Sequence, residues 1–204
     1  MSLRSAIVAQ FRKPRGVLGR LAGAIMAHRG SNRQRNFWTV DLLGLEPHHR
    51  VLEFGCGPGI ALQACAGCLR DGMVLGIDHS DVMVGQARRR LAVEIGEGRA
   101  EVRIGTLDDV VATGETFDRI FSANVIQFLP DMDAAFAQIR ALLSDGGMVA
   151  TTYQPRIAHP TRGQALDMAA RIEAAMAGAG FTGIARHELP LDPVPAICVT
   201  GSRG

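Results

Sequence analysis

Three glycines at alternate positions constrain the fold of this chain more than any other feature. Gly55, Gly57 and Gly59 follow a short apolar run, residues 51–54, and precede an apolar, helix-compatible stretch, residues 60–69. The glycines remove side chains where a buried strand turns into a helix. Such a loop lets a ligand approach the backbone closely and presents free N–H groups at the helix start. The pattern predicts a nucleotide-type cofactor site, with a tight turn that binds nothing as the alternative.

The residues around these glycines indicate the charge of the ligand. A dinucleotide fingerprint has the spacing Gly-x-Gly-x-x-Gly, whereas this chain has Glu53-x-Gly55-x-Gly57-x-Gly59. A carboxylate at the strand end would repel a diphosphate. Glu53 therefore favours a ligand with a cationic end and argues against the rival hypothesis of an NAD-linked reductase.

A second acid, Asp78, ends the next apolar run, residues 73–77. It lies about twenty residues beyond the glycines, the distance of one helix and one strand, so it should face the same crevice. A carboxylate at that position can accept hydrogen bonds from both hydroxyls of a ribose. Because NAD-binding proteins share this acid, Asp78 supports a nucleoside ligand but does not distinguish a dinucleotide from a nucleoside with a cationic end.

These two acids and the glycine spacing resemble motifs I and II of the class I S-adenosylmethionine (SAM)-dependent methyltransferases. SAM carries an ammonium and a sulfonium but no phosphate, as Glu53 requires. The resemblance extends from about Arg50 to the C-terminus and implies a methyltransferase with SAM as its cofactor. The residues that it assigns to cofactor binding are Glu53, Gly55, Cys56, Gly57, Gly59, Asp78, His79, Met83, Thr106, Leu107, Asn124, Val125 and Gln127.

The sequence departs from the family pattern in two places. The family usually has an acid where this chain has Thr106, and the threonine hydroxyl would bind adenine more weakly than an ionised group. Asp108 is a possible substitute. Gln127 stands where many relatives carry histidine. Two of the assigned residues also have other interpretations, since Met83 suits a plain core position and His79 an exposed one.

The order of the expected elements indicates the fold class. Strand and helix alternate up to residue 153, which predicts a Rossmann-like, doubly wound α/β sheet with helices on both faces. The last two strands, residues 184–189 and 196–200, are joined by a link too short for a parallel crossover, so they must be antiparallel. With the resemblance, this predicts seven strands in the order 3-2-1-4-5-7-6.

The N-terminal region is a basic arm on an acidic domain. Residues 1–40 hold eight Lys/Arg and no Asp/Glu, which leaves 14 − 20 = −6 for the rest of the chain. Apolar residues from Leu18 to Met26 recur at helical spacing, and a second helix is expected over residues 31–43. We divide the chain into a helical arm or lid, residues 1–44, and a methyltransferase domain, residues 45–204. The arm could pack on the domain, cover the site or touch an anionic membrane, and it also resembles a transit peptide.

Composition excludes several classes of protein. The chain has no apolar run of about 18 residues that could span a membrane, and polar residues interrupt its opening segment, which argues against a secretory signal. Four irregularly spaced cysteines do not form a disulfide framework, so we expect a cytoplasmic protein. Cys65 and Cys68 are interpreted as packing residues, with a redox role as the alternative. His48 and His49 lack other nearby ligands in the sequence, and no metal is expected.

The sequence leaves the acceptor and its chemistry open. Asn124-Val125-Ile126 lacks the Asn/Asp-Pro-Pro-Tyr/Phe tetrad of methyltransferases that act on nucleobase amines, so no nucleic-acid partner is expected. Aliphatic surroundings favour a small, fairly apolar acceptor. The catalytic residue stays unknown, as does the oligomeric state, and a SAM-binding regulator without turnover is the alternative. The polar groups near strand ends are Tyr153, His159, Gln127 and His79.

Overall fold

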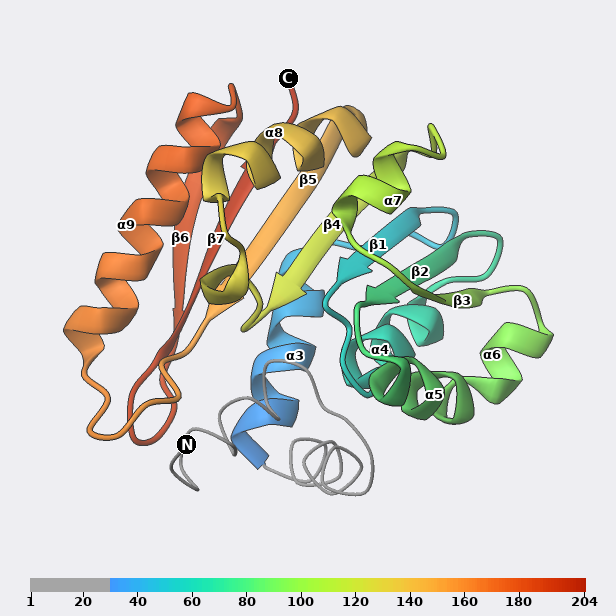
Figure 1. Ribbon diagram of the computed structural model, residues 1–204, viewed down its shortest axis with the longest axis horizontal. Helices are drawn as coiled ribbons and strands as arrows, with labels where there is room; N and C mark the ends of the chain where they lie inside the picture. Colours follow the sequence, from blue (N-terminus) through green and yellow to red (C-terminus); the bar gives the residue numbers. More distant parts are fainter. Residues whose placement is uncertain (1–29) are drawn as a thin grey trace.

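The computed structural model describes residues 30–204, which form a seven-stranded sheet flanked by helices (Figure 1). The strand order is β3-β2-β1-β4-β5-β7-β6, which confirms the prediction. β1 pairs in parallel with β2 and β4, and β7 runs antiparallel to both β5 and β6. The strands are β1 (Arg50–Phe54), β2 (Met73–Asp78), β3 (Ala100–Ile104), β4 (Phe117–Ala123), β5 (Leu143–Tyr153), β6 (Thr182–Leu189) and β7 (Ala196–Ser202).

Helices cover both faces of the sheet (Figure 1). α3 packs on α4 and on the strands β4 and β5, while α8 and α9 pack on one another and α9 contacts β5, β6 and β7. The helices are α3 (Gly30–Leu42), α4 (Ile60–Cys68), α5 (Asp81–Arg90), α6 (Ala92–Gly96), α7 (Leu107–Val111), α8 (Met132–Leu142) and α9 (Arg162–Gly178), with a 3₁₀ turn at Ile126–Phe128. No described helix is long and apolar enough to cross a membrane.

The sheet separates two hydrophobic cores, and the central strands contribute to both. Val51 of β1 packs in the core beneath α3 and α4, and its neighbour Leu52 packs in the core beneath α8 and α9. Both side chains are fully buried. Because successive residues of a strand face opposite sides, a parallel sheet covered on both faces needs such continuous apolar runs.

The structure differs from the sequence-based expectation in some elements. The helical spacing of Met83, Ala87 and Leu91 after Ser80 predicts one helix that Gly96 and Gly98 close. The structure divides this segment into α5 and α6 at Leu91, whose side chain is fully buried. β5 begins at Leu143, which pairs with Phe117 before a shift of register. Gly146, with φ +73°, lies in this irregularity, and periodicity does not predict such a bulge. The helix predicted around Leu18 to Met26 lies outside the described residues.

Candidate functional site

The carboxyl ends of β1, β2 and β4 meet at one edge of the sheet (Figure 1). Glu53 is the penultimate residue of β1, Asp78 ends β2, and Asn124 follows β4. In open parallel sheets this edge holds the ligand crevice. The structure therefore brings the two predicted acids to one edge, together with the glycine loop.

The backbone conformation and the space around each of the three loop glycines explain why these positions lack a side chain. All three have a positive φ, between 53° and 79°, a region that L side chains rarely adopt. A Cβ on Gly55 would lie 2.5 Å from Cγ2 of Val125, and one on Gly59 would lie 2.8 Å from Cδ1 of Leu91. A Cβ on Gly57 would meet nothing within 4 Å. Gly55 and Gly59 thus allow close packing, while Gly57 faces open space.

Asp78 links the loop to β2. Its carboxylate accepts hydrogen bonds from the backbone N–H of Gly57 and of Ser80, both at 2.9 Å, and the side chain is nearly buried. Each carboxylate oxygen can accept more than one hydrogen bond, so both oxygens can still accept hydroxyl groups. The ring nitrogen Nδ1 of His79 lies 3.8 Å from the same carboxylate, on a partly exposed side chain.

Glu53 is buried, and none of the residues that the structure describes supplies a counter-ion for it. The side chain is 3% exposed, and Oε2 has no hydrogen-bond partner among the described residues. Burial, and then the nearby charge of Asp78, raises the pKa of Glu53 well above its usual range. A cation at Oε2 would favour the ionised carboxylate and lower this pKa again. Together with the open face of Gly57 and the carboxylate of Asp78, this orphaned oxygen fits the cationic nucleoside SAM.

Asn124 connects β4 to the residue that follows β5. It has φ +58°, and its side chain makes two hydrogen bonds with the backbone of Gln154, donating to the carbonyl at 2.9 Å and accepting from the N–H at 2.7 Å. Nε2 of Gln127 donates to the carbonyl of Asn124 at 2.8 Å, and Oε1 of Gln127 is buried without a hydrogen-bond partner in the described part of the chain. This network holds a polar, partly unsatisfied group beside Val125 and the glycine loop.

The other residues assigned to cofactor binding differ in how far their side chains are exposed or free to bind a ligand. Met83 is almost completely buried in α5, which suits a core role. Cys56 is buried in the loop, and burial raises the pKa of its thiol. The hydroxyl of Thr106 donates to Asp109 at 2.9 Å within the capping box of α7, and Leu107 behind it is buried. Asp108 is exposed and accepts a hydrogen bond from Gln138.

Sequence reasoning missed Gln154 and underrated Arg35. Gln154 is 1% exposed, accepts a hydrogen bond from Nη1 of Arg35 at 2.8 Å and donates one to the carbonyl of Val194 at 2.9 Å. Arg35 in α3 is buried. From the sequence, the resemblance implies that Arg33, Arg35 or Asn36 could meet the carboxylate of SAM, and a solvated helix face explains these residues equally well. The absence of acids from residues 1–40 was the one signal that could have drawn attention to this cation.

Tyr153 and His159, two of the polar groups expected near strand ends, differ in their surroundings. Tyr153 ends β5 and is half-buried, and burial raises the pKa of its hydroxyl. His159 is exposed in the following loop. Neither position identifies a general base, so the catalytic residue stays unassigned.

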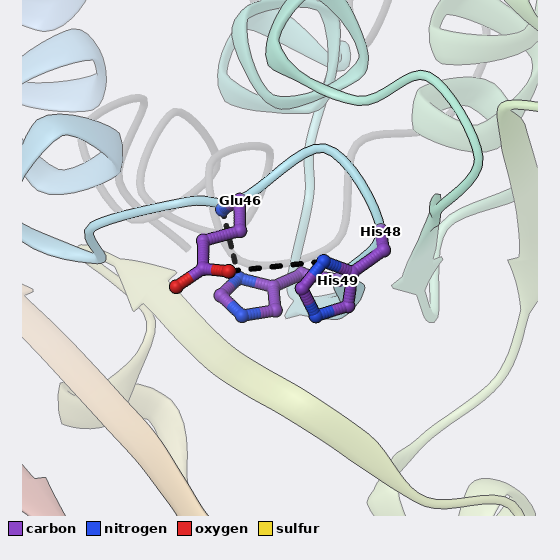
Figure 2. Close-up of side chains that lie close together, drawn as sticks. All are labelled: Glu46, His48 and His49. Carbon is purple, nitrogen blue, oxygen red and sulfur yellow. Dashed lines mark hydrogen bonds and ion pairs between the residues drawn. The ribbon is translucent and has the colours of Figure 1, made fainter.

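A separate cluster lies in the loop that precedes β1 (Figure 2). Nδ1 of His48 is 3.7 Å from a carboxylate oxygen of Glu46, and Nδ1 of His49 accepts a hydrogen bond from the Glu46 N–H at 3.0 Å. The argument that the two histidines lack a nearby third ligand was wrong, because the turn brings Glu46 to them. The cluster lies at the amino end of β1, away from the glycine loop, and the expectation of no metal stays a prediction.

The two cysteines of the Cys-x-x-Cys pair are free thiols in α4. Cys65 is fully buried in the core between α4 and the sheet, and Cys68 is exposed. Burial raises the pKa of Cys65 well above its usual range, which disfavours the reactive thiolate. This supports packing over a redox role.

Comparison with protein families and curated proteins gives consistent matches. The family model of a methyltransferase domain matches residues 52–149. An uncharacterized methyltransferase of Bacillus subtilis, YdaC, is 29% identical over 185 residues, which cover 90% of this chain and 98% of the relative. A trans-aconitate 2-methyltransferase of Methylobacterium radiotolerans is 30% identical over 57% of this chain and 42% of its own length.

Solved structures share the fold at low sequence identity. Magnesium protoporphyrin IX methyltransferase from Synechocystis, crystallised with bound SAH (S-adenosylhomocysteine), has a TM-score of 0.65 and 18% identity, covering 84% of this chain and 83% of that chain. A SAM-dependent methyltransferase from Aquifex aeolicus has a TM-score of 0.67 and 16% identity, covering 86% of this chain and 94% of that chain.

Proposed function

The chain belongs to the class I SAM-dependent methyltransferases, and on this premise we propose that it methylates a small, fairly apolar molecule by in-line displacement. The observation that carries the proposal is Oε2 of Glu53, which is buried without a hydrogen-bond partner among the described residues and lies near Asp78, whose carboxylate accepts the N–H of Gly57. A site with two carboxylates and no side chain over the loop glycine suits a cationic nucleoside.

In this proposal the residues of the chain mainly bind and orient. Glu53 takes the ammonium side of SAM, and Asp78 takes the ribose hydroxyls. When bound, SAM supplies an electrophilic methyl group on a sulfonium. The residues after β4 and β5 then hold the acceptor about 3 Å from that methyl, opposite the sulfur, and exclude water.

Two observations support an acceptor with an apolar body. Phe128, in the 3₁₀ turn that follows β4, and Ile157, in the loop after β5, are both large apolar residues that remain exposed. Exposed apolar residues near a ligand edge favour an apolar ligand surface. Relatives bear names as different as trans-aconitate 2-methyltransferase and ubiquinone biosynthesis O-methyltransferase, so similarity does not select one acceptor.

The arm, the domain boundary and the cellular location stay proposals. Within the proposed arm, residues 1–44, α3 is packed on the domain through the buried residues Thr39 and Val40. We propose that the preceding residues either continue this packing, cover the site or contact an anionic membrane surface. The reaction is assigned to the cytoplasm.

Replacing Asp78 tests the cofactor site. Asp78→Ala removes the acceptor for the Gly57 and Ser80 N–H groups and for the ribose, and we expect SAM binding to fall below detection in isothermal titration calorimetry. Asp71→Ala, an exposed acid in the turn before β2, is the matched control. Unchanged affinity in Asp78→Ala would place the ribose elsewhere, and binding of NAD with indifference to SAM would reverse the proposal.

A regulator that binds SAM without turnover is the second candidate. A screen of small thiols, phenols, amines and quinols with methyl-labelled SAM distinguishes it from an enzyme. We expect labelled product with at least one class of acceptor. Tight SAM binding with no product from any class would favour the regulator.

A further inference from the structure

Arg35 is a buried cation with neutral partners. Its side chain lies on α3 and is 3% exposed. Nη1 donates to the side-chain oxygen of Gln154 at 2.8 Å, and Nη2 donates to the side-chain oxygen of Asn32. Nε has no hydrogen-bond partner within residues 30–204. A guanidinium has more N–H donors than these two bonds use, so part of its binding capacity is open.

The described residues supply no counter-ion for this charge. Among residues 30–204, no carboxylate lies within 4.0 Å of the Arg35 guanidinium. The preceding residues cannot add one from a side chain, because residues 1–40 contain no Asp or Glu. Burial, followed by the charge of Arg156, lowers the pKa of Arg35 to about 9, which still leaves it charged at neutral pH. Buried charges are normally paired, so the missing partner is a ligand.

The guanidinium is held in a fixed place. Gln154 is oriented from both ends of its amide, by Arg35 and by the Val194 carbonyl, and its backbone is held by the Asn124 side chain. A second contact joins α3 to β5, between the hydroxyls of Thr39 and Thr152 at 2.7 Å. The cation is therefore preorganised above the carboxyl end of β5, which limits the entropy lost on binding.

The sheet order separates this cation from the cofactor acids. Glu53 lies next to the end of β1 and Asp78 ends β2, while Arg35 is bound to the residue after β5, on the other side of β4. Strands are about 4.8 Å apart, so the ends of β1 and β5 are separated by roughly 10 Å. The edge of the sheet at the carboxyl ends of β1, β2, β4 and β5 thus has two halves. One half is acidic, over β1 and β2, and the other is basic, over β5, where Arg156 adds a second positive charge.

We propose that the methyl acceptor is a small molecule with a carboxylate, which Arg35 binds beside the end of β5. This rests on the proposed function. The acidic half holds the cationic cofactor, and the basic half selects an anionic acceptor whose apolar body meets Phe128 and Ile157. Arg35 is a specificity-determining residue: it positions the acceptor through a charge-assisted hydrogen bond and takes no part in bond making.

Matched acids and amides test this proposal. Full-length protein saturated with SAH is titrated by calorimetry with benzoate and benzamide, cinnamate and cinnamamide, and hexanoate and hexanamide. We expect wild-type protein to bind at least one acid about tenfold or more tightly than its amide. Arg35→Met should abolish this preference, and Arg35→Lys should retain part of it. Arg171→Met, an exposed arginine within α9, is the matched control and should behave as wild type.

Ligand-free stability provides a second readout. Because Arg35→Met replaces an unpaired buried charge by an apolar chain of similar length, we expect the Tm to stay at or above that of wild type. A clear fall in Tm, in Arg35→Lys as well as Arg35→Met, would assign Arg35 to the fold and overturn the proposal.

Three other results would also overturn it. In the first, wild-type protein binds no acid more tightly than its amide. In the second, Arg35→Met still prefers the acid. In the third, Arg35→Met loses affinity for SAH while its preference for the acid is unchanged. The last result would identify the missing anion as the carboxylate of the cofactor. If wild type fails to bind SAH, the proposed function fails, and the acid and amide comparison without cofactor still tests Arg35.

Discussion

Glu53 is the residue whose ionisation should couple cofactor binding to pH. Burial raises its pKa in the folded protein, whereas an unfolded glutamate titrates near its ordinary value, about 4.3. The unfolded state therefore releases this proton at lower pH than the folded state does. By linkage, the contribution of Glu53 to stability is full below the unfolded pKa and is lost as the pH rises towards the folded pKa.

We expect Glu53→Gln to flatten this part of the pH dependence. The ligand-free variant should lose less stability than wild type between pH 5 and neutrality, because no buried carboxyl ionises. Its SAM affinity should fall by roughly 1.5–3 kcal/mol, the usual worth of a hydrogen bond to a charged group. Urea denaturation at several pH values and calorimetry with SAM measure the two effects. A variant with wild-type SAM affinity would show that the ammonium binds elsewhere.

The glycine loop between β1 and α4 combines backbone strain with open space. Gly57 and Gly44, which follows α3, have nearly the same positive φ, 53° and 55°. Neither would bring a Cβ within 4 Å of another atom. A side chain should therefore have the same conformational cost at both positions. The positions differ in that only Gly57 faces the proposed cofactor site.

This pair separates stability from binding. We expect Gly57→Ala and Gly44→Ala each to lower stability by about 1 kcal/mol, the cost of a non-glycine residue in the left-handed region. Only Gly57→Ala should weaken SAM binding, because its methyl group would project towards the ligand. Thermal unfolding and SAM titration of both variants make the comparison. Equal SAM affinity in the two would mean that the space at Gly57 is not the ligand site.

Charge is distributed unevenly along the chain as a whole. Residues 1–40 carry eight positive charges and no negative ones, and residues 41–204 carry a net −6. Opposite net charges attract the two segments at low ionic strength. The basic arm is therefore expected to associate with its own domain before any other acidic partner.

Neutralising the arm tests that expectation. Replacing three arginines of the full chain together by Gln should lower the Tm in low salt, by an amount equivalent to about 1–2 kcal/mol. The three are Arg15, Arg20 and Arg29. The difference from wild type should shrink as salt is added. An unchanged Tm with a raised acceptor KM would favour a lid. Lost sedimentation with anionic phospholipid vesicles would instead favour membrane contact.

The fold and the cofactor half of the site could be predicted because their signals are local. Glu53, the three loop glycines and Asp78 are separated by fixed numbers of residues, and a strand and a helix of ordinary length turn that spacing into position. The short link before β7 likewise required an antiparallel pair. The convergence of the two acids therefore followed from the spacing of residues, while the strand order followed from the family resemblance that these residues carry.

The acceptor half depended on contacts that leave no spacing pattern. Arg35 and Gln154 are 119 residues apart in the sequence. They meet and become buried only because α3 packs across β4 and β5. The division of the long helix at Leu91 and the approach of Glu46 to His48 arise in the same way. Sequence by itself determined which strands end in acids and where the backbone must lack side chains. Tertiary structure alone decided which polar groups lose water, because burial depends on residues that are distant along the chain.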